Sequence, residues 1–434
     1  MSAQRAKNIV REQEIWDVAV IGGGAAGMMA AGQAAAKGAR VVLVEKNTGL
    51  GKKLLITGGG RCNITNAEPK ERVFLSKFNS RGKAADQFLF SPFSRHSVKD
   101  SIAFFNDHGL QTKVEARERV FPITNMAESV WDVLVNVLKE KNVQVISGTG
   151  VVNIVSKEHH IDYITLVNDQ RMYARSYIFA TGGLSRPDTG STGDGFEWLK
   201  KLGHTVAAPD PSLVPLTLKD SWIPALAGLS LPDISLSLIE DGKKVASQTG
   251  GLLFTHQGIS GPAALNLSKE VGERLPYGLV PLRLDLLPKI SLEALDDVLL
   301  QSVAENSNKK IRNALTTLIP SALIPIILTL ARVHEERISH SLTREERIAL
   351  GSVIKNIPLT AKGRLGFEKA IIASGGAELT EIDMKTMRSR IIDNLYIIGD
   401  LLNIDRPSGG YSLQLCWTTG TVAGQSAAER ASPG

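Results

Sequence analysis

Apolar and polar positions between residues 16 and 46 predict a β-strand, a helix and a second β-strand. Val18, Val20 and Ile21 form a short apolar run, as in a strand that is buried on both faces of a parallel sheet. A glycine-rich turn follows, and small residues at 31, 34 and 38 keep one face of the next helix narrow. Residues 41–44 form the next apolar run. We therefore predict a βαβ unit at the start of a parallel sheet.

The same patterning continues to about residue 205. The pattern predicts a helix, two strands and a hairpin turn. A further strand follows, then two glycine-rich turns, and then a second helix. These elements are a helix at 130–138, strands at 143–146 and 151–155, a hairpin through Asn168-Asp169, a strand at 177–180 and a helix at 196–202.

From Pro209 the pattern changes, with four prolines by Pro224 and then alternating strands at 234–239 and 279–284. Residues 291–350 show helical periodicity, and Thr343 to Glu346 has the pattern of a capping box. Strand patterning returns at 395–398, before a long helix of small residues that ends near Ala428. The middle of the chain is therefore predicted to hold an inserted β-rich domain and a helical subdomain.

These changes of pattern predict an α/β protein with a discontinuous Rossmann-like domain. We expect its first part at 1–205 and its second part at 371–434. The inserted β-rich domain is expected at 206–290, the helical subdomain at 291–352, and a return through the β-rich domain at 353–370.

The first turn has the G-x-G-x-x-G pattern of a dinucleotide site. Gly22 permits the tight turn, Gly24 lets the backbone approach a pyrophosphate, and Gly27 lets helix and strand pack closely. Glu45 follows about 20 residues later, where a carboxylate accepts from a ribose hydroxyl. An acid at this position favours FAD or NAD over NADP. The alternative is a βαβ unit whose glycine turn binds nothing.

Two further glycine-rich turns follow apolar runs. Ala180-Thr181-Gly182-Gly183 is the type of turn with which two-dinucleotide flavoproteins close their first domain against the cofactor, although alone it is only a run of small residues. Residues 190–195 (GSTGDG) open a helix, either as a cradle for phosphate or substrate or as a well-capped helix start.

A third signal lies near the C-terminus, where a strand ends in Gly399-Asp400 and Ser408-Gly409-Gly410 opens a helix. Asp400 could accept from ribityl hydroxyls, while the positive end of the helix faces the pyrimidine edge of a flavin and favours its reduced, anionic state. The alternative is an aspartate that caps its own helix.

Composition is that of an ordinary soluble enzyme. The 434 residues are 43% hydrophobic and include two cysteines, Cys62 and Cys416, whose wide separation suits neither a disulfide framework nor a zinc site. Residues 1–15 are polar and are expected to form a loose arm rather than a secretory signal. The longest apolar stretch, 318–331, is too short to span a bilayer and contains two prolines. We expect no membrane segment, no metal and a cytoplasmic location.

The net charge of +6 is concentrated in one segment. Residues 46–99 hold eleven lysines and arginines against three acids, interleaved with five phenylalanines. Basic groups mixed with aromatics suit an RNA substrate, because cations bind phosphates and rings stack on bases. The alternative is a solvated surface over an amphipathic helix whose phenylalanines face the core. The phenylalanines are Phe74, Phe78, Phe88, Phe90 and Phe93.

The loop at 51–63 (GKKLLITGGGRCN), with Thr65-Asn66, resembles the hallmark of the BaiN-type, aminoacetone-oxidase-like FAD-dependent flavoproteins. The motifs at 119–122 (RVFP), 180–183, 190–195, 253–262 (LFTH and GISGP) and 409–411 follow in the order of that family. The resemblance implies FAD in a discontinuous Rossmann-like domain of the two-dinucleotide-binding flavoprotein type. It also implies that the inserted domain is a small β-barrel with a helical subdomain.

The resemblance implies a set of FAD-binding residues drawn from these glycine-rich turns. Two depart from the usual family pattern, since Asp400 stands where Glu is usual and Ser412 where Asn is common; Cys416 replaces a small apolar residue and is expected to pack in its helix. The implied set is Gly22, Gly24, Ala25, Ala26, Gly27, Glu45, Lys46, Lys53, Thr57, Gly58, Gly59, Gly60, Arg61, Cys62, Asn63, Thr181, Gly182, Gly183, Gly399, Asp400, Gly409, Gly410, Tyr411 and Ser412.

Members of the family are linked to amine oxidation, to reduction of bile-acid enones and to dihydrouridine formation in large-subunit ribosomal RNA. No second G-x-G-x-x-G occurs in a strand-turn-helix setting, so NADH or NADPH would visit the flavin transiently as electron donor. The basic segment favours uracil in ribosomal RNA as the hydride acceptor. The alternatives are an aminoacetone-type oxidase, a steroid enone reductase, and a non-catalytic RNA-binding or redox-sensing flavoprotein.

Three residues of the hallmark loop are candidates for catalysis. Cys62 follows Arg61, whose charge would tune the thiol as a proton donor; the alternative is a buried packing cysteine. Lys53, Arg61 and His256 are candidate contacts of substrate or flavin, and His256 has a structural histidine as its alternative.

Overall fold

The computed structural model describes residues 15–80 and 83–431. The chain divides into two compact units, one of Met1–Asp210 with Ile372–Gly434 and one of Pro211–Ile371. The expected boundaries at 205/206 and 370/371 lie close to these breaks. Nearly all of the expected N-terminal arm, and Arg81 of the basic segment, lie outside the described residues.

The first unit is built on a parallel sheet, as the sequence pattern predicts. The strand order is β8-β2-β1-β11, and β20 also pairs with β11; all these pairs are parallel. The antiparallel strands β10 and β9 extend the sheet from β11 through the predicted hairpin at 168–169. The strands are β1 (Ile15–Ile21), β2 (Val41–Glu45), β8 (Gln144–Ser147), β9 (Val151–Lys157), β10 (His160–Leu166), β11 (Arg171–Phe179) and β20 (Leu395–Ile397).

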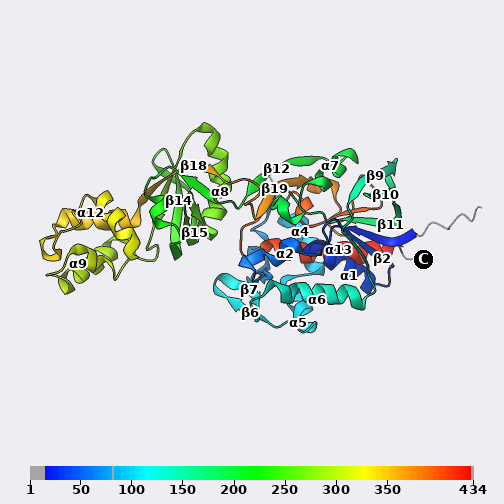
Figure 1. Cartoon of the computed structure of the whole chain (residues 1–434), viewed down its shortest axis with the longest axis horizontal. Coiled ribbons are helices and arrows are strands. Elements are labelled where there is room, and N and C mark those ends of the chain that lie inside the picture. The colour runs from blue at the N-terminus through cyan, green and yellow to red at the C-terminus, as the bar shows by residue number, and fades with distance from the viewer. Residues whose placement is uncertain (1–14, 81–82, 432–434) are drawn as a thin grey trace, which may run out of the picture. The chain divides into compact units, whose positions relative to one another are not determined.

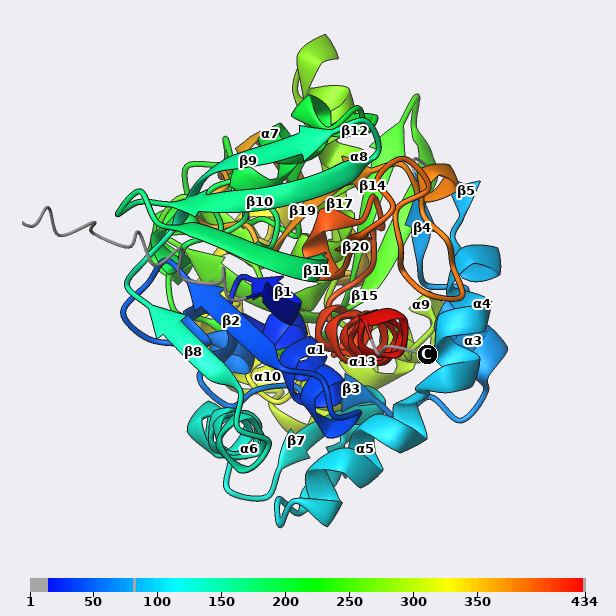
Figure 2. The same cartoon turned by 90° about the vertical axis from the view of Figure 1, so that its right-hand side faces the viewer.

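Strand β1 is buried on both faces because its side chains alternate between two cores. Val18 and Val20 pack with α1 (Ala25–Ala36), α6 (Ala127–Glu140) and α13 (Tyr411–Ala431), whereas Ala19 and Ile21 pack in the core on the other face. The predicted helices at 130–138 and after 410 are thereby confirmed. Figure 2 shows α1 and α13 side by side against the sheet.

Small residues bring α1 and α13 into close contact. A Cβ on Gly420 would lie 2.7 Å from the carbonyl oxygen of Ala26, and one on Gly424 would collide with the carbonyl of Ala30. These contacts place the middle of α13, at Gly420, beside the first turn of α1.

The other elements of the first unit surround this sheet. These other elements are α2 (Lys52–Leu55), β3 (Thr65–Asn66), α3 (Glu71–Leu75), β4 (Asn79–Ser80), β5 (Lys83–Ala84), α4 (Asp86–Arg95), α5 (Val98–Asp107), β6 (Thr112–Glu115), β7 (Arg119–Pro122), α7 (Asp194–Lys201), β12 (Val206–Ser212) and β19 (Ile372–Ala377). None of the helices in the described part of the chain is both long enough and apolar enough to cross a membrane.

The second unit contains a closed β-barrel with the strand order β13-β16-β15-β14-β17-β18 (Figure 1). The helices α9 to α12 are inserted between the strands β17 and β18. Helix α12 starts with the predicted capping box, in which Thr343 and Glu346 each accept from the other's backbone N–H. The elements are β13 (Leu216–Leu218), β14 (Ser230–Glu240), β15 (Lys243–Thr255), β16 (Gly258–Ser260), α8 (Pro262–Arg274), β17 (Val280–Asp285), α9 (Leu292–Glu305), α10 (Ile311–Leu315), α11 (Ile324–Ala331), α12 (Arg344–Lys355) and β18 (Ile357–Arg364).

Candidate functional site

The glycine turn between β1 and α1 has a different constraint at each glycine. Gly22 adopts φ +107°, and a Cβ there would lie 2.5 Å from the carbonyl oxygen of Ala180. A Cβ on Gly27 would overlap the carbonyl of Gly22. Gly24 is the opposite case, since a Cβ there would meet no atom within 4 Å. The open space lies at the start of α1, whose N-cap side chain provides no acceptor, so the turn can take a pyrophosphate.

Glu45 is buried at the end of β2 and faces this turn. Its Oε2 accepts from the backbone N–H of Gly23 at 2.7 Å, and its Oε1 accepts from the backbone N–H of Asn47 at 2.8 Å. These bonds fix the carboxylate beside the glycines, which is the position expected for a ribose contact.

The loop that follows α2 contains left-handed backbone and space. Gly58, Gly59 and Gly60 all have positive φ, and Cβ atoms on Gly59 and Gly60 would meet nothing within 4 Å. The Oδ1 atom of Asn63 is buried and has no hydrogen-bond partner among the described residues. A buried acceptor in that state fits a ligand that donates to it.

The turn after β11 shows a second such atom. Within the described chain, the buried Oγ1 of Thr181 also lacks a hydrogen-bond partner. A Cβ on Gly183 would lie 3.3 Å from the carbonyl oxygen of Asp400, so this turn lies directly beside the turn after β20. Open glycine cradles and two orphaned polar atoms therefore occur at residues that the sequence assigned to FAD, and these residues fit that cofactor.

Lys53, Asp400 and Arg406 form a charged cluster. The Nζ of Lys53 donates to Ser185 Oγ at 2.5 Å and lies 3.2 Å from Asp400 Oδ2. Arg406 donates to the other oxygen of Asp400, and its Nε donates to Ser412 Oγ at 3.1 Å. Residues from α2, the β20 turn and the start of α13 thus meet at one point.

The two cations decide the charge of Asp400. Burial alone would raise the pKa of this carboxyl group, but the positive charges of Arg406 and Lys53 outweigh burial and lower the pKa to about 2. Asp400 is therefore an anion at every physiological pH. The side chains of Lys53 and Arg406 hold both of its oxygens. Asp400 therefore does not act as the cap of α13.

Four other residues that the sequence assigned to flavin or substrate have different surroundings. Arg61 donates to Glu115 at 2.5 Å and lies over the ring of Phe121, and Lys46 pairs with Asp194 at 2.7 Å at the start of α7. The ring of Tyr411 packs in the aromatic core, and His256 is exposed in the turn between β15 and β16 of the second unit.

Cys62 lies in the core rather than at an open surface. It is completely buried in the cluster that contains Leu54, Ile64 and Trp417. Burial raises the pKa of its thiol to about 12, against a smaller opposing effect of a hydrogen bond with Thr57. This location supports the packing alternative over the proton donor, because no described charge lowers the pKa of the thiol.

We expect both cysteines to resist alkylation in the folded protein. Burial raises the pKa of Cys416 to about 12 as well, so roughly one thiol in ten thousand is ionised at pH 8. Iodoacetamide at pH 8 should leave both thiols unmodified, and both should react in guanidinium chloride, as measured by mass spectrometry. Rapid modification of native Cys62 would restore its candidacy as a proton donor.

The structure corrects the aromatic part of the nucleic-acid argument. Phe74, Phe78 and Phe93 are each 1% exposed, and their ring centroids lie 5.5 to 6.0 Å apart in the core beside Tyr411. Phe88 is partly buried, and Phe90 is 64% exposed. Three of the five rings are therefore core residues that cannot stack on bases, and only the positive charge of the segment remains as a signal.

Arg406 and Ser185 were missed by the sequence reasoning. Arg406 is buried, and its Nη1 also donates to the carbonyl of Ile404 at 2.7 Å. The available signal was a charged residue between a strand end and a glycine-led helix, close to Asp400. Ser185 follows Gly183 by two residues and could have been included with that turn.

Comparison with known proteins gives the family. The family described as HI0933-like protein Rossmann domain matches residues 16–426. A 3-dehydro-bile acid Δ(4,6)-reductase of Clostridium scindens is 30% identical over 95% of this chain and 99% of its own. A ribosomal RNA dihydrouridine synthase of Escherichia coli is 28% identical over 95% of this chain and 98% of its own.

Solved structures show the same fold at low sequence identity. The 3-ketosteroid Δ1-dehydrogenase of Sterolibacterium denitrificans aligns with a TM-score of 0.56 at 13% identity, over 96% of this chain and 99% of its own. An Escherichia coli quinol fumarate reductase subunit aligns with a TM-score of 0.52 at 16% identity, over 97% of this chain and 71% of its own. The chain thus belongs to the HI0933-like family of Rossmann proteins and is an FAD-dependent oxidoreductase.

Proposed function

We propose that this enzyme reduces a carbon–carbon double bond conjugated to a carbonyl group, with NADH or NADPH as electron donor and uracil of large-subunit ribosomal RNA as substrate. One observation carries the reaction class: relatives that match almost the whole chain are named for reducing such bonds, in a bile acid and in ribosomal RNA. The double bond of uracil and that of a steroid enone share this conjugation.

The FAD-binding residues follow from the fit of the site. The open turn at Gly24 would hold the pyrophosphate, and Glu45 would hold the adenosine ribose. Asn63 and Thr181 would give their orphaned atoms to the cofactor. When bound there, FAD supplies the two-electron transfer between nicotinamide and substrate.

The charged cluster gives the chain its own part in the reaction. Reducing such a double bond develops negative charge on the conjugated carbonyl oxygen, which a fixed cation stabilises. The side chain of Lys53 is 25% exposed and that of Arg406 is 1% exposed. We therefore assign Lys53 to stabilise this oxygen and Arg406 to hold Asp400 in place.

Charge supports RNA as the substrate. The chain has a net charge of +6 and a pI near 9.1, and residues 46–99 carry a surplus of eight positive charges. Such a surplus favours a polyanion, because each neutralised phosphate releases counterions.

Mapping of modified nucleotides tests the substrate. We expect a strain that lacks the gene to lose one dihydrouridine from large-subunit ribosomal RNA, and the purified enzyme with NADH or NADPH to restore it. Mass spectrometry of RNA fragments measures both. Unchanged RNA would contradict the substrate.

A steroid enone is the second candidate, favoured by the relative of 30% identity that is named as a bile-acid reductase. Oxidation of the nicotinamide by a steroid enone but not by ribosomal RNA would support it. Peroxide from aminoacetone and oxygen, without nicotinamide, would instead indicate an amine oxidase. Failure of NADH and NADPH to reduce the flavin in stopped-flow absorbance would remove nicotinamide-driven reduction altogether.

A further inference from the structure

A cavity lined by charged and hydroxyl side chains lies in the first unit, at the C-terminal end of α13. It has a volume of about 670 Å³ and is lined by α4, by the segment before β20, by Tyr396 of β20 and by the last turns of α13. Four cations line it, Arg95, Lys385, Arg388 and Arg430, together with one acid, Glu429. We call this the basic cavity.

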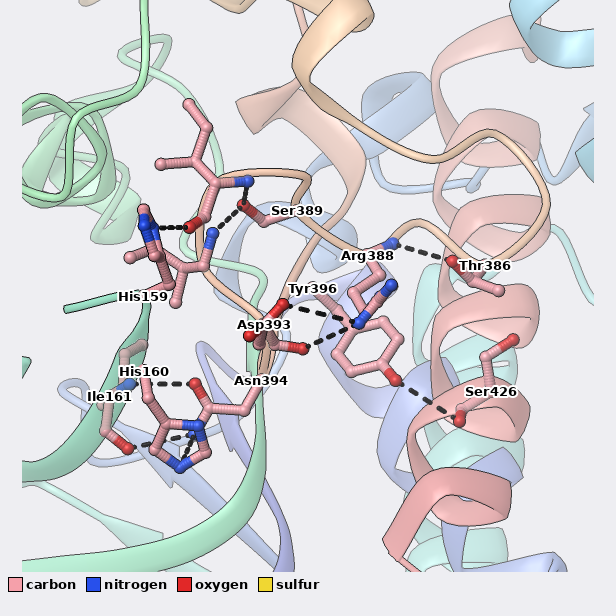
Figure 3. A network of polar contacts seen from close by, with 12 residues as sticks. His159, His160, Ile161, Thr386, Arg388, Ser389, Asp393, Asn394, Tyr396 and Ser426 are labelled. Carbon is pink, nitrogen blue, oxygen red and sulfur yellow. Dashed lines mark hydrogen bonds and ion pairs between the residues drawn. The ribbon is translucent and has the colours of Figure 1, made fainter. Parts of the chain in front are cut away.

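Neutral groups hold Arg95 in the basic cavity and do not neutralise its charge. Arg95 donates to three neutral acceptors: the carbonyl of Lys385 at 2.9 Å, Ser426 Oγ at 3.2 Å and Gln425 Oε1 at 3.3 Å. Figure 3 shows Arg388 near the ring of Tyr396, whose hydroxyl donates to the carbonyl of Ser426.

The nearby acids leave part of this charge uncompensated. Arg388 lies 3.8 Å from Asp393, and Glu429 lies 3.8 Å from Lys37, outside the lining. Within the described part of the chain, neither Lys385 nor Arg430 has an ion-pair partner. The lining carries a surplus of three positive charges, which Asp393 beside Arg388 reduces to two. Cations beside hydroxyl groups are a set of donors that suits phosphate oxygens.

The basic cavity is remote from the charged cluster at the other end of α13. Ser412 and Arg430 are 18 residues apart on this helix, which corresponds to roughly 27 Å. A steroid or a single nucleotide cannot reach both places, whereas a polymer can. Contacts to phosphates at such a distance position a nucleic acid without reading its sequence.

We propose that the basic cavity binds backbone phosphates of the RNA substrate and positions that RNA for reaction at the distant flavin site. This inference rests on the proposed function. It assigns the RNA contact to Arg95, Lys385, Arg388 and Arg430, and of these only Arg95 belongs to the basic segment 46–99.

The test compares two double variants that each remove two exposed cations. Lys385→Gln with Arg430→Gln removes charge from the basic cavity, and Lys139→Gln with Lys141→Gln removes the same charge at the end of α6, which does not line it. Binding of a fluorescent large-subunit ribosomal RNA fragment is measured by anisotropy at salt concentrations from about 50 to about 300 mM, a range that includes physiological ionic strength. Flavin absorbance confirms that each variant retains FAD.

We expect the cavity variant to bind roughly ten-fold more weakly near 150 mM salt. Two lost phosphate contacts should also make the slope of log affinity against log salt shallower by about 1.4, since each contact to a single strand contributes about 0.7. Lys385→Arg with Arg430→Lys should retain wild-type binding. The rate of flavin reduction by nicotinamide should be unchanged in all variants.

The outcomes separate this inference from the proposed function. If wild-type protein binds and modifies the RNA but the cavity variant matches the Lys139/Lys141 control, the basic cavity is not the RNA contact and the proposed function stands. If wild-type protein neither binds nor modifies RNA, both are overturned. Weaker binding and a shallower salt slope in the cavity variant alone support the inference.

Discussion

Replacing Gly27 with alanine should strongly destabilise the first unit. A Cβ at this position would overlap the carbonyl oxygen of Gly22 and lie 3.0 Å from its carbonyl carbon, and these are backbone atoms at the end of a buried strand. Neither α1 nor β1 can move freely, because α13 packs closely against α1. We expect a loss of at least about 3 kcal/mol, a large fraction of the stability of a typical domain. Urea unfolding followed by circular dichroism measures it.

Gly24→Ala is the matched control for that variant and should have the opposite phenotype. Gly24 has φ −79° and ψ −172°, which alanine adopts without strain, and a Cβ there would meet no protein atom within 4 Å. We expect the fold and the unfolding midpoint to persist. The added methyl group would occupy the space assigned to the pyrophosphate, so FAD affinity should fall on the order of a hundred-fold, about 2.7 kcal/mol. Titration of the apoprotein with FAD measures this loss.

The pair separates the role of the turn in folding from its role in binding. If Gly24→Ala bound FAD as tightly as the wild type, the pyrophosphate would not lie at the start of α1. If Gly27→Ala unfolded at the wild-type midpoint, the close approach of α1 to β1 would be wrong.

Much of the fold follows from short-range pattern. The apolar runs of β1 and β2, the three glycines between them and the small residues of α13 each have a local physical requirement, and the structure has the predicted elements at these positions. The inserted barrel and helices were readable for the same reason, because alternating strands, prolines and a capping box change the local pattern.

The parts that sequence could not provide depend on residues far apart in the chain. Lys53, Ser185 and Asp400 follow β2, β11 and β20, and they meet only because these strands and β1 lie in one sheet. No spacing in the sequence encodes that contact. Phe74, Phe78 and Phe93 alternate with charges, yet they pack in the core, because the α3 and α4 region turns its apolar side inward. Cys62 follows an arginine in sequence, but the guanidinium of Arg61 pairs with Glu115 instead of approaching the thiol.

Arg406→Met should destabilise the first unit by about 3 kcal/mol at pH 7, because it leaves the buried carboxylate of Asp400 with Lys53 as its remaining cation. Adding Asp400→Asn should recover much of this loss, since the buried charge is then removed as well. Urea unfolding of the apoproteins measures both. Equal stability of Arg406→Met and wild type would mean that the pair does not hold this turn.

The same pair should make stability depend on acid pH in a defined direction. The folded-state pKa of Asp400 is lowered from 3.8 to about 2, so its contribution is complete above about pH 4 and is lost as the pH falls through 2. That shift corresponds to about 2.4 kcal/mol. The stability difference between wild type and the Arg406→Met, Asp400→Asn variant should therefore change by about 2 kcal/mol between pH 5 and pH 2, because Asp400 is still half ionised at pH 2. A difference that stays constant over this range would show that Asp400 is not an ion held by Arg406 and Lys53, and the charged cluster would lose its assigned part in the reaction.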